Sequence, residues 1–482
     1  MEKSFVPSSI LPLFVLLVFA VGCPIDHDPP DPVVDPVVGS IDLIDGSDTG
    51  VSNTDNVTSD TTPSFTGTSD MSGTLEIVSD VDGVVYSGPV PAGSWGPVTA
   101  KIVSHAGTTG TVHHLRARIT AQGGGVGQSD ALSVTFDTTA PVPDSFLPAD
   151  DTVLVVWNSD LTVSFTETIY AGTGSVTLRN STDATDVSYD VSAPELTGWG
   201  TNALTLNPNS DLDSNRNFCI LQDAGAVTDA AGNACAGITD NAAWNFSSAL
   251  RDMFSYPASG DLVTQSGGVW TELSGGAAVA FGNTQGKAWT NYVSSPTGRI
   301  TCIPASDGQE VRCELASPWQ AADGAVYLAF IVKEQTAATP FVNGCGIAFY
   351  NGPALLAGVS LYNMPFPPEF GLTAYVDDNT DNRQKLSDQM YYDMLFVFRY
   401  DPNAPAGEKL KGWYYLTNFD TGTVEGTGSN RATGGFDPAT SWTQITHIGI
   451  SQRWRCSNNL NPQFEIDALK VVRSWDDLDE GR

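Results

Sequence analysis

Alternating oxygen-bearing side chains between Tyr375 and Asn382 are the chain's clearest candidates for cation chemistry. Asp377, Asn379 and Asp381 stand at every second position after an apolar run. Calcium loops open with carboxylate and amide oxygens at this spacing, but the glycine and the closing glutamate of an EF-hand are absent here. The segment therefore fits a solvated acidic loop as well as a calcium-binding one.

Aromatic side chains beside this loop and near the C-terminus are candidates for ligand binding. Sugars present flat apolar faces and hydroxyl edges, so their sites combine aromatic rings with a few polar groups. Tyr375 precedes the acidic loop, and Trp454 lies between two arginines directly before Cys456. We predict Tyr375 and Trp454 as ligand-binding residues, while a structural cation–π contact would explain Trp454 equally well.

Glu465 and Asp467 superficially resemble the clustered acids of jelly-roll glucanases, which place alternating acids on one strand face. Glycosidases require two facing carboxyl groups about 5–9.5 Å apart. Ala468 and Leu469 follow, so a third acid on the same strand face is missing. The chain has no Gly-x-Ser-x-Gly motif, and its histidines stand in no recognisable triad setting. We therefore predict that the chain is not an enzyme.

The N-terminus carries an export signal. An apolar run behind Lys3 ends in small residues immediately before Cys23, which indicates a lipoprotein signal peptide at residues 1–22 and lipid on the Cys23 thiol. The site is similar to the bacterial lipobox, except that Ala20 stands where leucine is usual; an ordinary secretory signal is the alternative. Residues 23–39 are rich in proline and aspartate and predict an extended tether. One partner is thus a membrane surface, reached through acyl chains.

The composition is strongly acidic. The chain carries 55 Asp and Glu against 22 Lys and Arg, a formal net charge of −33. A field of that sign repels phosphate backbones, which argues against nucleic acid as a partner. No cofactor is required by the sequence, and Ca²⁺ is the ion that this charge would attract if it does more than keep the protein soluble.

Six cysteines remain once Cys23 is assigned to lipid. An even number in an exported protein favours disulfides, and metal ligation is weaker because no Cys-x-x-Cys occurs. Short separations suggest pairs that close hairpins, although six cysteines allow about fifteen connectivities. The expected pairs are Cys219 with Cys235, Cys302 with Cys313, and Cys345 with Cys456.

Residues 40–141 predict a β-sandwich, because short alternating runs are separated by Asp-Gly and Gly-rich turns. They resemble the bacterial Ig-like repeats of large surface adhesins. That resemblance rests on four motifs: Ser47-Asp-Thr-Gly, Asp60-Thr-Thr-Pro, Gly93-Ser-Trp-Gly and Phe136-Asp-Thr-Thr-Ala-Pro. It implies that junction aspartates hold Ca²⁺, here Asp48, Asp55 and Asp137. The family's late Asp-x-Ala-Gly-Asn is replaced by a glycine-rich run at residues 123–127.

Residues 142–248 show the same period-two alternation and predict a second two-sheet sandwich. This unit is similar to the Ig-like domain of bacterial S-layer proteins, most specifically in Asp229-Ala-Ala-Gly-Asn. Gly232 and its neighbour tolerate positive φ, so this run predicts a turn. Asp223 and Asp229 are either turn-capping residues or metal ligands.

Residues 250–482 are the longest and most aromatic part. Strand-like runs with Gly, Pro and Asp connections fit a double-sheet jelly roll. Phe254-Ser-Tyr-Pro-Ala, Gly346-Ile-Ala-Phe-Tyr and the run after Phe464 are similar to laminin-G or concanavalin A-like domains. Within the aromatic run at residues 413–415, the outer two side chains share one strand face and the middle one takes the other, so at least one face is expected in the core.

The expected fold class is therefore all-β, with two Ig-like β-sandwiches followed by a concanavalin A-like jelly-roll sandwich. A lipid anchor, an acidic stalk and a distal ligand-binding domain predict a surface adhesion or carbohydrate-binding protein. Its partner would be an extracellular glycan or a surface protein, at the bacterial cell surface or periplasmic face. The alternatives are a structural cell-envelope protein that binds no sugar and, more remotely, a jelly-roll enzyme that degrades glycans.

Overall fold

The computed structural model describes residues 32–105, 107, 110–254, 256, 260–274, 280–282, 299–302, 310–334, 345–365, 368–374, 394–415, 431–432, 437–438, 441–451 and 464–478. The expected signal peptide and the first part of the tether lie outside the described residues. So do seven residues singled out in the sequence: Cys23, Tyr375, Asp377, Asn379, Asp381, Trp454 and Cys456. Within the described part of the chain, no helix is long and apolar enough to cross a membrane.

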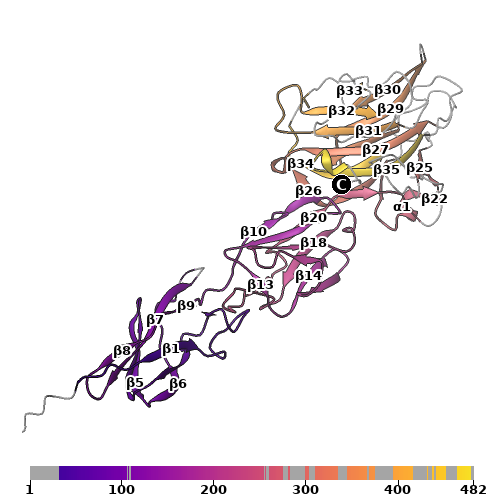
Figure 1. Cartoon of the computed structure of the whole chain (residues 1–482). Coiled ribbons are helices and arrows are strands. Elements are labelled where there is room, and N and C mark those ends of the chain that lie inside the picture. Colours follow the sequence, from indigo (N-terminus) through magenta and orange to yellow (C-terminus); the bar gives the residue numbers. More distant parts are fainter. Residues whose placement is uncertain are drawn as a thin grey trace, which may run out of the picture. The chain divides into compact units, whose positions relative to one another are not determined.

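The chain divides into two compact units, and strands make up nearly all the regular structure described in both (Figure 1). The first unit comprises Met1–Ile44, Thr62–Ile102 and His114–Ser133. The second comprises Asp45–Thr61, Val103–His113 and Val134–Arg482.

Strands that lie wholly or mainly in the first unit form two sheets around an alternating core. One sheet has the order β1-β3-β6, and in the other β4 pairs with both β5 and β7, while β8 pairs with β7. Leu115, Ala117 and Ile119 alternate with polar residues along β7 and are fully buried, as the period of two requires. The bounds are β1 (Val38–Leu43), β3 (Ser64–Ser69), β4 (Gly73–Ser79), β5 (Gly83–Val90), β6 (Gly93–Thr99), β7 (Thr111–Ala121) and β8 (Val126–Gln128).

Regular structure begins inside the stretch expected to be a tether. The first strand starts at Val38, and the residues before it already bond to the first unit. The Val37 N–H donates to Asp70, and the Val126 N–H donates to Asp35. The extended proline-rich segment therefore ends before the first strand.

The second Ig-like sandwich lies wholly in the second unit. One sheet has the order β10-β12-β17-β16 and the other β11-β20-β18-β14-β15, with a short β13-β19 ribbon beside them. Inward residues alternate along β12, where Leu161, Val163 and Phe165 are buried. The bounds are β10 (Pro143–Leu147), β11 (Thr152–Val155), β12 (Leu161–Phe165), β13 (Tyr170–Ala171), β14 (Ser175–Asn180), β15 (Thr185–Asp190), β16 (Leu196–Thr197), β17 (Ala203–Leu206), β18 (Asn217–Gln222), β19 (Val227–Thr228) and β20 (Asn245–Ser248).

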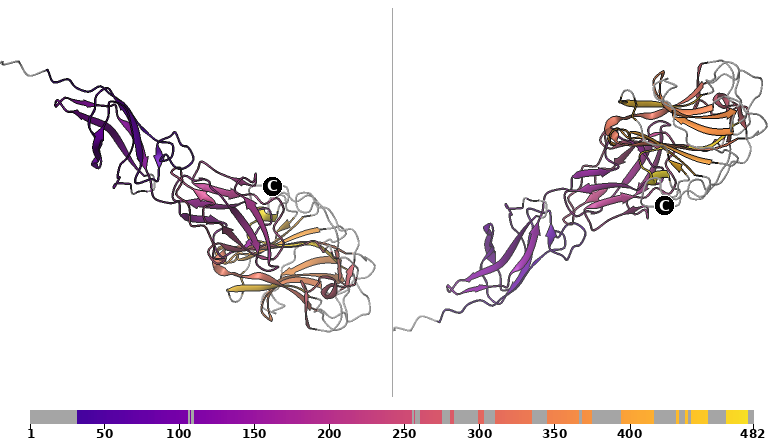
Figure 2. Two further views of the ribbon diagram at one scale, coloured as in Figure 1. Left: turned by 90° about the horizontal axis from the view of Figure 1, so that it is seen from below. Right: turned by 90° about the horizontal axis from the view of Figure 1, so that it is seen from above.

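The C-terminal part is a two-sheet jelly roll, and Figure 2 shows its strands, in orange to yellow, as two layers. The larger sheet has the order β22-β24-β25-β35-β27-β31-β32-β33, with β21 also pairing with β35, and the smaller has the order β23-β26-β34-β28-β29-β30. The larger sheet comprises β21 (Leu250–Asp252), β22 (Gly260–Asp261), β24 (Ala280–Gly282), β25 (Arg299–Cys302), β27 (Val326–Glu334), β31 (Met394–Tyr400), β32 (Leu410–Tyr415), β33 (Arg431–Ala432) and β35 (Phe464–Val472). The smaller comprises β23 (Thr271–Ser274), β26 (Glu310–Gln320), β28 (Cys345–Asn351), β29 (Ala354–Pro365), β30 (Pro368–Ala374) and β34 (Gln444–Ser451). Together with the Ig-like sandwiches, this confirms the expected all-β fold class.

Both faces of β32 are buried, whereas its aromatic run predicted this for at least one face. Trp413 and Tyr415 both contact Trp475, which approaches from the C-terminal segment, with ring centroids 5.1 and 6.3 Å away. Tyr414 lies on the opposite face and contacts Phe396. None of these three strand residues is an exposed platform for a ligand, since each is at most 9% exposed.

The second Ig-like sandwich and the jelly roll share one continuous apolar core. Trp157, which follows β11, belongs to this core and is 3% exposed. The guanidinium of Arg251 lies 4.4 Å from the centre of the Trp157 ring, and the ammonium of Lys470 lies 5.1 Å from it. Both cations belong to the jelly roll, so one indole of the Ig-like domain is held by two charges of the neighbouring domain.

Two of the expected disulfides are absent, because Cys219, Cys235 and Cys313 are free buried thiols. Phe218 and Ile220 face the core on either side of Cys219, so Cys219 points to the opposite face of β18, whereas Cys235 belongs to the core.

The second missing pair is separated by the thickness of the jelly roll. Cys302 lies on β25 of the larger sheet and Cys313 on β26 of the smaller. Facing sheets are about 10 Å apart, and a disulfide needs Cα atoms closer than about 7 Å. These positions correct both pairings. Cys345 begins β28, and its expected partner lies outside the described residues.

We expect these three thiols to be alkylated without prior reduction. Iodoacetamide added to the denatured, unreduced protein should label the peptides that contain Cys219, Cys235 and Cys313, as measured by peptide mass spectrometry. Recovery of the Cys219 and Cys235 peptides joined by a disulfide would show that the two thiols do not lie on opposite sides of β18.

Candidate functional site

Three acidic side chains converge in the second unit. Asp137 directly follows β9 (Leu132–Phe136), Glu167 lies between β12 and β13, and Asp229 directly follows β19. Each offers one carboxylate oxygen, and these oxygens all lie within 4.8 Å of one another. The three residues, called the acidic triad below, are at most 9% exposed.

Backbone hydrogen bonds fix the first member of the triad. The end of β9 pairs with β2 (Val57–Thr58), and the Asp137 N–H donates to the Thr58 carbonyl at 2.9 Å. The Asp137 carboxylate accepts the Thr139 N–H at 2.9 Å, which is an Asx-type turn. Burial raises the pKa of Asp137, the Thr139 N–H opposes this, and the neighbouring Asp229 raises it further.

The Asp-Ala-Ala-Gly-Asn turn positions the third member. Gly232 has a φ of 89°, a conformation that suits glycine. The Asp229 carboxylate accepts both the backbone N–H of Asn233 at 2.8 Å and its side-chain amide at 2.7 Å. The same Asn233 amide donates to the Asp137 carbonyl at 2.9 Å. Asp229 is therefore both a turn residue and a member of the triad.

Glu167 is the member whose charge is least compensated. It is 9% exposed, and its buried Oε1 has no hydrogen-bond partner among the residues that the structure describes. Burial is the largest cause that raises its pKa from 4.5 to about 7, followed by repulsion from Asp229 and then Asp137. Glu167 is therefore unfavourable in its charged form, because it is buried beside two further carboxylates.

The donor set fits a calcium ion. Ca²⁺ binds carboxylate and carbonyl oxygens at about 2.3–2.6 Å, so two oxygens on one ion lie no more than about 5 Å apart. Asp137, Glu167 and Asp229 meet this condition. A bound divalent cation would supply the charge that Glu167 lacks and would tie the end of β9 to two loops of the second Ig-like domain.

The structure groups the predicted calcium ligands differently from the sequence. Asp137 belongs to the triad with Glu167 and Asp229, whereas Asp48 and Asp55 are two neighbouring carboxylates that repel each other. Asp48 is buried, which raises its pKa, and an N–H of the following loop opposes this before the charge of Asp55 adds to it. Asp55 caps its own turn by accepting the Val57 N–H.

The segment around Asp48 nevertheless contacts the turn that carries the triad. The Thr49 hydroxyl donates to the Ala231 carbonyl at 2.8 Å, and the Val51 N–H donates to the Ala230 carbonyl at 3.2 Å. Gly50 between them has a φ of 95°, and a Cβ there would lie 2.0 Å from the Ala230 oxygen. Only glycine fits this approach.

Two further acids singled out in the sequence, Asp223 and Asp467, lie outside the triad. Asp223 accepts the backbone N–H and the hydroxyl of Ser175, both at 2.9 Å, so it acts as a capping residue. Asp467 on β35 is 4% exposed, and the side chain of Glu465 lies outside the described residues.

Sequence reasoning passed over Glu167, although one signal marks it. Leu161, Val163 and Phe165 point inward at every second position, and Glu167 continues that parity before the buried Ile169. An acid at an inward position needs a partner.

Two sandwiches precede the jelly roll in the sequence, and the family comparison matches each of them to a model. Residues 35–138 match a model described as "Bacterial Ig-like domain", and residues 137–248 match a second model with the same description. Such domains are typical of surface-exposed proteins. None of the curated proteins matches the chain.

Several solved structures are distantly similar. Lectin II from Ulex europaeus is 13% identical with a TM-score of 0.30, over 46% of this chain and 97% of that one. The globular domain of T. cruzi calreticulin is 8% identical with a TM-score of 0.26, over 43% and 84%. A pseudo β-1,3-glucanase of Mycobacterium tuberculosis is 10% identical with a TM-score of 0.30, over 47% and 98%. No functional conclusion follows from similarities this low.

Proposed function

We propose that this chain is a lipid-anchored adhesion or carbohydrate-binding protein of the bacterial cell surface. The two Ig-like domains serve as a stalk, and the jelly roll serves as the ligand-binding head. The observation that carries the proposal is the order of the parts, in which two bacterial Ig-like sandwiches precede one large jelly roll. The shared core around Trp157 supports it, because a head fused to its stalk resists a pull on the bound ligand.

Binding without catalysis is part of the proposal. The acid that the sequence places on the closing strand, Asp467, is buried inside the jelly roll, so its carboxylate is poorly placed to reach a polymer from solvent. A hydrolase needs two carboxyl groups that both face the substrate.

Calcium in the acidic triad would support the stalk rather than the ligand. Asp137, Glu167 and Asp229 lie in the Ig-like part of the second unit. We therefore expect that removing calcium changes the stability of the chain and leaves the chemical class of bound ligand unchanged.

A glycan array tests the proposal. The exported chain, residues 23–482, should retain glycans of one chemical class when the array is run with calcium. It should retain the same class when the array is run with EDTA. If no glycan is retained under either condition, the jelly roll is not a carbohydrate-binding head, and adhesion to a protein or the structural envelope role becomes the better account.

A further inference from the structure

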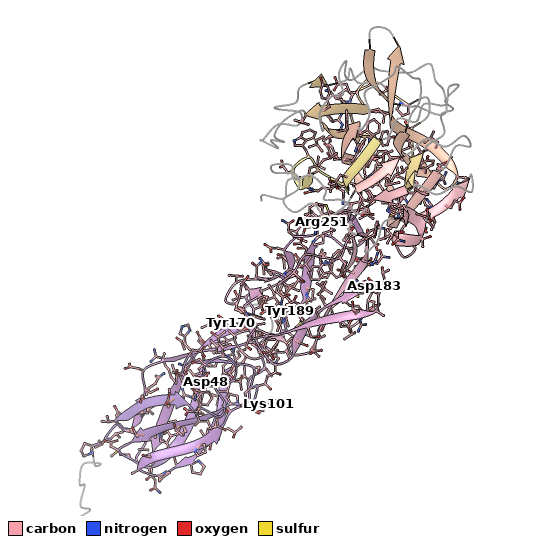
Figure 3. The ribbon with its side chains drawn as sticks, turned by 90° about the vertical axis from the view of Figure 1, so that its right-hand side faces the viewer. Asp48, Lys101, Tyr170, Asp183, Tyr189 and Arg251 are labelled. Carbon is pink, nitrogen blue, oxygen red and sulfur yellow. The ribbon has the colours of Figure 1, made fainter. Side chains whose placement is uncertain are left out.

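Two adjoining cavities lie where the second Ig-like domain meets the jelly roll, at what is called the seam below. The seam is formed by residues 180–183 and 211–217 of the Ig-like domain and residues 250–254, 256, 268–271 and 314–316 of the jelly roll. The cavities measure about 350 and 320 Å³, and Asn215, Arg216 and Val269 line both. Figure 3 labels Asp183 and Arg251, which line the larger one. Each volume is at the lower end of the range of about 300–1,000 Å³ typical of ligand sites, which favour domain interfaces.

The walls of the seam are fixed by hydrogen bonds that cross it. The Asn215 side chain donates to the Glu314 carbonyl at 2.8 Å and accepts the Ala316 N–H at 2.7 Å. The Asn217 side chain donates to the Ala316 carbonyl at 3.1 Å and accepts the Ser317 hydroxyl at 2.9 Å. The site is therefore formed before any ligand arrives, which lowers the entropy lost on binding.

Donors and acceptors alternate along the Ig-like wall. The Asn180 amide donates to Asp183 at 2.9 Å and to Asp213 at 3.2 Å. The Arg216 Nε donates to Asp183 at 2.7 Å, and its Nη1 donates to two backbone carbonyls. Each of these bonds engages only one carboxylate oxygen, so the second oxygens and the Nη2 of Arg216 can meet a ligand.

This pattern matches a sugar. A hydroxyl group both donates and accepts a hydrogen bond, so a carboxylate beside a guanidinium satisfies it completely. Buried apolar surface completes the match, because Leu250 and Val269 line the larger cavity and Leu315 lines the smaller. The C–H face of a sugar ring packs on such surface.

The charges of the seam favour a neutral ligand over an anionic one. Four carboxylates line the two cavities, those of Asp183, Asp213, Asp252 and Glu314, against the two guanidiniums of Arg216 and Arg251. The chain as a whole carries a formal charge of −33, which repels polyanions.

We propose that the seam binds a neutral saccharide, with Asp183, Asp213 and Arg216 holding its hydroxyl groups. This site lies at the junction and adds a second contact for glycan beside the one proposed above for the jelly-roll head. A ligand here touches both domains, so it would bind only while the Ig-like domain and the jelly roll stay docked.

Two variants and one matched control test the seam. Asp213→Ala removes an exposed acceptor, and Arg216→Lys keeps the charge but loses the planar set of donors. Asp186→Ala is the control, since it removes an exposed carboxylate that pairs with Arg179 and lines neither cavity. Residues 23–482 are titrated by calorimetry with maltotriose, cellotriose and mannotriose, and the melting temperature of each variant confirms folding.

The expected result is binding of one trisaccharide that weakens at least 10-fold in Asp213→Ala and in Arg216→Lys and changes less than 2-fold in Asp186→Ala. Unchanged affinity in the folded Asp213→Ala variant would show that the seam is not the saccharide site, and it would leave the proposal of a ligand-binding jelly roll unaffected. Binding of none of the three sugars also overturns the seam, and the glycan array then decides the proposed function separately.

Discussion

Replacing Trp157 by alanine is expected to lower the free energy of unfolding by about 3–5 kcal/mol, the usual cost of deleting a buried tryptophan. The ring is 3% exposed, and the Arg251 guanidinium and the Lys470 ammonium lie 4.4 and 5.1 Å from its centre. Lys470 is fully buried, and its ammonium also donates to the Leu478 carbonyl at 3.1 Å. Alanine would leave this buried charge facing a void, which adds to the loss of apolar contact.

The same substitution should also separate two unfolding events. With Trp157 present, the second Ig-like domain and the jelly roll share a core and should unfold in one calorimetric transition. Trp157→Ala should split that transition in two. Trp157→Phe keeps an aromatic face for the cations and should lose less. Trp199→Ala, a half-buried tryptophan of the same domain, should lower stability without splitting the transition. A single transition in Trp157→Ala, at nearly the original temperature, would contradict the role given to this residue.

Glu167→Gln is expected to stabilise the chain in EDTA at pH 8, although it alters a buried residue. The pKa of Glu167 is raised from 4.5 to about 7, so between these two pH values the folded state keeps a proton that the unfolded state has released. Its contribution to stability is therefore lost as the pH rises from about 4.5 to about 7, and a penalty of up to about 3 kcal/mol remains above that range. Glutamine carries no charge and avoids the penalty.

Calcium should reverse the order of stability, so that wild type becomes more stable than Glu167→Gln. A cation bound by Asp137, Glu167 and Asp229 favours the charged carboxylates, so wild type should gain more melting temperature from calcium at pH 8 than at pH 5. Glu167→Gln should gain much less at either pH. Glu195→Gln, a half-buried glutamate of the same domain outside the triad, is the control. An equal gain in melting temperature from calcium in wild type and Glu167→Gln would show that the triad does not bind calcium.

The sequence predicted the architecture better than it predicted the sites. Period-two alternation, as in β7 and β12, specifies which residues face a core and predicts several all-β domains, whereas the Ig-like and concanavalin A-like assignments rested on resemblance. The acidic triad depends instead on which loops meet. Asp137 was a predicted ligand and Asp229 a possible one, but Glu167 comes from another loop, and no spacing in the sequence connects the three.

The disulfide prediction shows the same limit. Cys219 and Cys235 are close in sequence, and a hairpin pairing was reasonable on that ground alone. Whether two side chains meet depends on the face of the strand, and Phe218 and Ile220 take the core face beside Cys219. Parity within the strand carried this information, while sequence separation did not.

Affinity capture followed by mass spectrometry tests the central claim most directly. The immobilised exported chain, residues 23–482, is exposed to a mixture of oligosaccharides overnight and is then eluted. A carbohydrate-binding head that is not an enzyme should retain one class of oligosaccharide and release it at its original length. Retention of nothing would contradict carbohydrate binding, and recovery of shortened products would show that the jelly roll is a glycan-degrading enzyme.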